Sequence, residues 1–226
     1  MTATALAPST DGLDLARMRT AMVSSQLRPT AVSDNRVVAA MAVVERERFL
    51  PAAVAGMAYR DTLIPLGHGR FQNIPMATGR LLTNAELIRE DRVLLIGAAG
   101  GYTAAVLATM GMQVVAVEEH PALAELARTA LADTVGVTVV EAPLTAGAPD
   151  HAPFDVLVID GAVEQVPLAL AEQLRPEGRI VTGLFDRGVT RLAAGRRTAA
   201  GAGVLPFADA ECAVLPGFST PQGFVF

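Results

Sequence analysis

The chain has 226 residues, of which 51% are hydrophobic and 18% are charged, and its formal net charge is -5. This composition excludes a disordered chain, gives no basic patch for a nucleic-acid partner, and contains no apolar stretch long enough to predict a membrane partner. The single cysteine, Cys212, excludes an internal disulfide and a multi-cysteine metal site, so we expect a buried thiol, a cytoplasmic protein and no bound metal.

The chain is expected to form one domain after a short leader. Residues 1–12 contain small residues but lack the basic start and apolar stretch of a secretory signal, so we predict a disordered leader. The rest, residues 13–226, is somewhat short for two independent cores. We divide it into residues 13–82, which hold N-terminal helices and a long loop, and residues 83–226, which hold an α/β core.

The first part predicts two amphipathic helices. From Leu13 to Leu27 and from Ser33 to Val44, apolar residues recur at three- and four-residue spacing. The charged residues 45–48 that follow are interpreted as a solvated helix end. Residues 59–76 contain two prolines and two glycines in a pattern typical of a loop, and a loop of this length often carries function.

The second part alternates short apolar runs with helical segments. Strands buried on both faces and separated by helices predict a parallel, doubly wound α/β sheet. From residue 190 onward the pattern indicates antiparallel strands at one edge of that sheet. The predicted strands are Arg92–Gly97, Gln113–Glu119, Val137–Ala142, Phe154–Gly161 and Gly178–Phe185, and the predicted helices are Gly101–Gly111, Pro121–Asp133 and Glu164–Leu174.

The stretch Val93–Ala108, VLLIGAAGGYTAAVLA, places a glycine-rich turn between a strand and a helix. Such a turn lets a ligand approach the backbone closely. Glu118 follows about 20 residues later at the end of the next strand, where a carboxylate can accept both ribose hydroxyls. The turn lacks the full glycine pattern that cradles a pyrophosphate, so an adenosine-containing ligand without phosphates is favoured over simple close packing of helix on strand.

Several longer blocks resemble the protein-L-isoaspartate O-methyltransferase family. They are MVSSQLRPTAVSDNRVVAAMAVVERERFLP at residues 22–51, AYRDTLIPLGHGRFQNIP at 58–75, the turn at 93–102, and FDVLVIDGAVEQVPLALAEQLRPEGRIV at 154–181. The resemblance implies a Rossmann-like methyltransferase sheet of about seven strands with extra N-terminal helices. It also implies the cofactor S-adenosylmethionine and methylation of the carboxylate of isoaspartyl residues in damaged proteins.

The chain departs from the family pattern in the loop that is expected to hold the acceptor. The family reads Gly-x-Gly-Gln-Thr-Ile-Ser-x-Pro there, whereas this chain has Arg70, Phe71, Gln72 and Asn73 after its second glycine. Both hydroxyls are therefore absent. The amide of Asn73 could donate the lost hydrogen bond, whereas the ring of Phe71 would reshape the acceptor pocket.

The site prediction therefore has two parts. The acceptor side consists of His68, Phe71 and Asn73. The predicted cofactor-binding residues are Gly97, Ala99, Gly101, Tyr102, Glu118, Glu119, Leu144 and Asp160.

The favoured hypothesis is a methyltransferase for an isoaspartyl protein or a related small acceptor. Two alternatives stay open: a catalytically lapsed relative that serves as a binding module, and a nicotinamide-dependent oxidoreductase.

Overall fold

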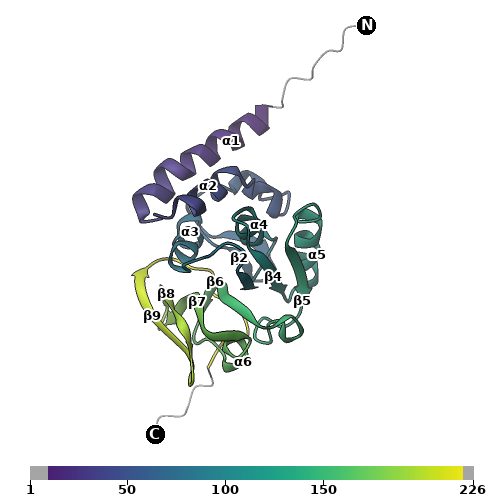
Figure 1. The fold of residues 1–226 in the computed structure, drawn as a ribbon. Coiled ribbons are helices and arrows are strands. Elements are labelled where there is room, and N and C mark those ends of the chain that lie inside the picture. Colours follow the sequence, from purple (N-terminus) through teal and green to yellow (C-terminus); the bar gives the residue numbers. More distant parts are fainter. Residues whose placement is uncertain (1–9, 221–226) are drawn as a thin grey trace.

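A seven-stranded sheet lies at the centre of the chain, in the order β5-β4-β3-β6-β7-β8-β9 (Figure 1). The computed structural model describes residues 10–220. The pairings from β5 to β7 are parallel, and β8 and β9 join antiparallel at the edge opposite β5. The strands are β3 (Arg92–Ile96), β4 (Gln113–Glu118), β5 (Val137–Glu141), β6 (Phe154–Val163), β7 (Leu174–Asp186), β8 (Val189–Thr198) and β9 (Gly201–Asp209). The predicted α/β class, strand number and antiparallel edge are confirmed.

The apolar runs of the sequence are buried because the sheet is covered on both faces. Along β3, Val93 and Leu95 belong to one core and Leu94 and Ile96 to the other, as the alternation of a strand requires. The first core packs under most of the helices, and the second lies under α6 and the loops beside it. The helices are α1 (Thr10–Met22), α2 (Asn35–Val43), α3 (Pro75–Asn84), α4 (Tyr102–Thr109), α5 (Pro121–Ala130) and α6 (Leu168–Ala171).

The N-terminal helices form where their pattern predicts them. Helix α1 begins at Thr10 and continues through a wider turn to Leu27, so residues 10–12 of the expected leader are helical and residues 1–9 lie outside the described part. Helix α2 begins after Asp34, whose carboxylate accepts a hydrogen bond from the Arg36 amide at 2.8 Å. No helix within residues 10–220 is long and apolar enough to cross a lipid bilayer.

Two predictions for the segment between α2 and α3 are wrong. Residues 45–48 are not a solvated helix end: Arg46–Phe49 is a short 3₁₀ helix, and the Arg46 side chain is fully buried. The predicted loop at 59–76 contains a two-stranded antiparallel hairpin, β1 (Ile64–Gly67) with β2 (Arg70–Gln72). Its strands are too short for periodicity to identify, and they form because alternate side chains are buried against the domain.

Candidate active site

The carboxyl ends of β3, β4 and β6 meet where the sheet changes winding direction. β4 lies on one side of β3 and β6 on the other. In open α/β sheets a ligand binds at this point, beyond the carboxyl ends of the strands. The turn 97–101 follows β3 here, and the amides of Gly97 and Ala98 both donate to the Val117 carbonyl at 3.1 Å.

The turn depends on glycine at a position where nothing larger fits. A Cβ atom on Gly100 would lie 1.9 Å from the carbonyl oxygen of Phe49, so the chain at 49 and the turn are in backbone contact. Ala99 adopts a φ of 49°, which is a left-handed conformation that costs an alanine about 1 to 2 kcal/mol. The turn is thus fixed in shape by its surroundings as well as by its own residues.

Glu118, the predicted ribose-binding residue, is fully buried at the end of β4. Its Oε2 accepts from the amide of Ala99 at 2.8 Å, and its Oε1 accepts from the amide of His120 at 3.1 Å. Oε1 also accepts from Nη1 of Arg70 at 2.6 Å, across a buried ion pair. The carboxylate is therefore oriented toward the turn, and the sequence analysis missed its charged partner.

Asp160 lies in the last part of β6 and accepts hydrogen bonds from three side chains. Its Oδ1 accepts from Nδ2 of Asn73 at 2.8 Å and from Oγ1 of Thr78 at 3.0 Å. Its Oδ2 accepts from Oγ1 of Thr103 at 2.5 Å. The sequence analysis missed both threonines, although Thr103 directly follows the turn residues at the start of α4. Thr78 gives no comparable signal because α3 is not part of the βα pattern.

Asn73 connects three parts of the chain. Besides its bond to Asp160, its Oδ1 accepts from the amide of Ala213 at 2.7 Å, and its side chain is 1% exposed. Both ends of the amide group are therefore engaged within the protein. Phe71 is 40% exposed and lines a small cavity beside Asn73.

Tyr102 faces the interior, where it contacts the buried Arg46. The Arg46 guanidinium lies 4.7 Å from the centre of the Tyr102 ring, and its Nε donates to the Ala58 carbonyl at 2.8 Å. Its Nη2 donates to the carbonyl of Asn73. Burial raises the pKa of Tyr102 to about 12 and lowers the pKa of Arg46 from its ordinary value. Arg46 thus supports both the loop and the first turn of α4.

The remaining predicted residues lie around the same strand ends. The exposed His68 ring stacks on that of His120, two residues after Glu118, at 3.7 Å between centres. Glu119 is partly exposed, and Leu144 is buried in the second core. Cys212 is also buried, as predicted, and burial raises the pKa of its thiol to about 12.

The residues around the turn suit an adenosine ligand, but little space is open between them. A carboxylate suits the ribose hydroxyls, and a glycine turn allows close approach of a ligand, but both the Glu118 carboxylate and the turn are buried here. The cavity has a volume of about 10 Å³. Leu215 packs near Gly97, and Arg70 reaches Glu118 beside the turn. The site is thus narrow in this structure. The cavity is lined by Phe71, Gln72, Asn73, Gly97, Ala98, Ala99, Tyr102, Thr103 and Asp160.

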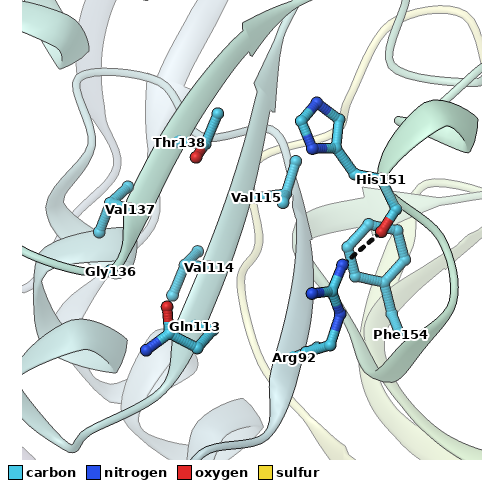
Figure 2. A pocket seen from close by; sticks show the side chains of 9 residues that line it. All are labelled: Arg92, Gln113, Val114, Val115, Gly136, Val137, Thr138, His151 and Phe154. Atoms are coloured by element: carbon cyan, nitrogen blue, oxygen red, sulfur yellow. Dashed lines mark hydrogen bonds between the residues drawn. The ribbon is translucent and has the colours of Figure 1, made fainter.

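A larger cavity lies at the opposite end of the parallel strands (Figure 2). Its volume is about 240 Å³, and Arg92 and Gln113 mark it as the amino end of β3 and β4. Nη2 of Arg92 donates to the carbonyl of His151 at 2.6 Å. None of the predicted site residues lines this cavity.

The comparisons with known proteins cover most of the chain. A family model described as protein-L-isoaspartate(D-aspartate) O-methyltransferase matches residues 17–202. The chain is 43% identical over 171 residues to a protein-L-isoaspartate O-methyltransferase of Methylorubrum extorquens, with 74% of each chain covered. It is 40% identical over 181 residues to protein-L-isoaspartate O-methyltransferase 2 of Marinobacter nauticus, with 79% of this chain and 82% of that one covered.

Solved structures show the same fold at low identity. A protein-L-isoaspartate O-methyltransferase matches with a TM-score of 0.74 and 22% identity, covering 88% of this chain and 66% of that one. A Plasmodium falciparum chain given the family's name and solved with S-adenosyl-L-homocysteine matches with a TM-score of 0.70 and 14% identity, covering 89% and 97%. The family model and the sequence relatives show that the chain belongs to the protein-L-isoaspartate(D-aspartate) O-methyltransferase family.

Proposed function

We propose that this chain is an S-adenosylmethionine-dependent O-methyltransferase that acts on the carboxylate of isoaspartyl residues in proteins. Glu118 carries the proposal, because this buried carboxylate lies beside the glycine turn at the switch point of the sheet. Membership of the family supports the same activity and does not favour a lapsed binding module or an oxidoreductase. The cytoplasm is the proposed compartment, supported by a single, buried cysteine.

The chemistry requires positioning more than proton transfer. S-adenosylmethionine supplies an electrophilic methyl group on its sulfonium. The acceptor carboxylate is ionised at neutral pH, so it needs orientation and exclusion of water rather than a general base. Phe71 lines the cavity at the acceptor side. Asp160 holds the loop in place by accepting a hydrogen bond from Asn73. The remaining cofactor-side assignments, Gly97, Ala99, Gly101, Glu119 and Leu144, are part of this proposal.

The first test is calorimetry of the purified chain with S-adenosylhomocysteine and, separately, with NAD. We expect binding of the first ligand with a dissociation constant below about 1 mM, and no heat with NAD, because the turn lacks the glycines that cradle a pyrophosphate. Binding of NAD instead would favour the oxidoreductase. The absence of heat with both ligands, in a folded protein, would contradict the proposed function.

Phe71→Thr is expected to raise kcat/KM for an isoaspartyl peptide by about tenfold. A hydroxyl at this position can donate to the acceptor carboxylate, and a hydrogen bond to a charged group contributes about 1.5 to 3 kcal/mol, while 1.36 kcal/mol corresponds to tenfold in rate. Asn73 is left unchanged because its amide holds Ala213. The matched control is Phe71→Val, which has the shape of threonine without the hydroxyl. Equal rates for the two variants would show that only the removal of the ring matters.

A further inference from the structure

The strongest unexplained contact is the ion pair between Arg70 and Glu118. Nη1 of Arg70 lies 2.6 Å from Oε1 of Glu118, and the two side chains are 3% and 0% exposed. The carboxylate also accepts from the amides of Ala99 and His120. Two carboxylate oxygens offer about four acceptor positions, and three of them are used. Two ribose hydroxyls therefore cannot both bind Glu118 while Arg70 remains.

Arg70 is held incompletely in this position. Its Nε and Nη2 are buried and have no hydrogen-bond partner among residues 10–220. A guanidinium binds a carboxylate best through two parallel N–H groups, whereas here a single nitrogen makes the contact. Release into water would satisfy the unpartnered groups. The pair is therefore one that a ligand can displace, rather than a fixed element of the core.

The segment that carries Arg70 is a hairpin outside the main sheet. Arg70 begins β2 of the hairpin, which forms a sheet of its own, separate from the seven-stranded sheet. The turn at Gly67, His68 and Gly69 has positive φ throughout, and a Cβ on either glycine would meet no atom within 4 Å. The ion pair and the stacking of His68 on His120 join the hairpin to the end of β4. Both contacts lie at the predicted ribose position.

We infer that Arg70 is an affinity-determining residue of the nucleoside site: its guanidinium is bonded to Glu118 in this structure and competes with the ribose of an adenosine ligand. The inference rests on the proposed function, which supplies the nucleoside. Binding requires the guanidinium to leave Glu118, and part of the binding free energy is used to displace it. The residue at this position in the family pattern is glutamine, which carries no charge to compete with.

The test compares the affinity for S-adenosylhomocysteine of the unmodified chain, Arg70→Gln and Arg60→Ala, measured by calorimetry. We expect Arg70→Gln to bind at least tenfold more tightly than the unmodified chain. Arg60→Ala removes an exposed arginine from the same part of the chain and should change affinity less than twofold. Equal or weaker binding by Arg70→Gln, with the unmodified chain still binding, would overturn the inference and leave the proposed function intact.

A second measurement tests the pair without any ligand. The melting temperatures of Arg70→Gln, Glu118→Gln and the double variant form a cycle. Each single variant leaves a buried group without its charged partner. The melting temperature of the double variant should therefore fall by less than the sum of the two single decreases. Additive losses would show that the pair does not form in solution and would overturn the inference. If the losses are non-additive but neither the unmodified chain nor Arg70→Gln binds S-adenosylhomocysteine, the ion pair forms but both the proposed function and the proposed competition with ribose fail.

Discussion

Arg46→Ala is expected to lower the free energy of unfolding by about 3 to 5 kcal/mol. The guanidinium donates to the carbonyls of Ala58 and Asn73 and lies over the Tyr102 ring, all in a fully buried position. Its removal leaves two buried carbonyls without their charged donor and opens a cavity. Each buried carbonyl that is left without its donor costs about 1 to 3 kcal/mol, and the cavity adds to this loss.

The matched control for Arg46 lies two residues away. Arg48 is exposed on the same short helix, and Arg48→Ala is expected to change the free energy of unfolding by less than about 0.5 kcal/mol. Denaturation with urea, followed by circular dichroism, measures both variants. Equal losses in the two would mean that Arg46 is solvated, as the charge pattern alone suggests, and that its buried contacts do not form.

Gly100→Ala is expected to destabilise the chain by about 3 kcal/mol or more. The added Cβ would lie 1.9 Å from the carbonyl oxygen and 2.8 Å from the carbonyl carbon of Phe49. These are backbone atoms, which cannot change rotamer to make room, so the cost lies at or above the upper end of that for overpacking. Separation of the turn from residue 49 would also shift the Ala99 amide away from Glu118.

The control for Gly100 is Gly56→Ala, which should have the opposite sign. A Cβ on Gly56 meets no atom within 4 Å, and its backbone is not left-handed. Alanine lowers the conformational entropy of the unfolded chain, so the free energy of unfolding of this variant is expected to rise by about 0.4 to 1 kcal/mol. Thermal and chemical denaturation measure both variants. A loss of similar size in each would indicate a general cost of alanine rather than a clash at the turn.

Much of the fold was predictable because the forces that form it are local. The continuous apolar run at the start of the βα core requires cover on both faces, and the structure provides it for Leu94 and Leu95 alike. Asp34 marks the start of α2 because its carboxylate satisfies an amide only two residues away. The place of Glu118 at the end of a strand was predictable in the same way, from the apolar run that precedes it.

The contacts that were missed join residues far apart in the sequence. Arg46 belongs to a charged run like any solvated one, and only the approach of the chain at 58 and 73 makes it a buried donor. Arg70 and Glu118 are separated by 48 positions, so no pattern links them. The sequence shows which residues can donate or accept hydrogen bonds. It does not show which of them pair, because the pairs depend on how distant parts of the chain pack together.

The contacts of residues 213–215 affect when the site can form as the chain is synthesised. Its backbone pairs with Ala162 through the Ala213 carbonyl at 2.7 Å and the Leu215 amide at 2.9 Å, while the Ala213 amide reaches Asn73 across 140 positions. During synthesis, the loop and the strands that it contacts emerge first and begin to fold as the chain grows. The contacts of Ala213 with Asn73 and of Leu215 with Gly97 therefore form only after residue 215 has been made, and in a nascent chain Asn73 lacks this partner until then.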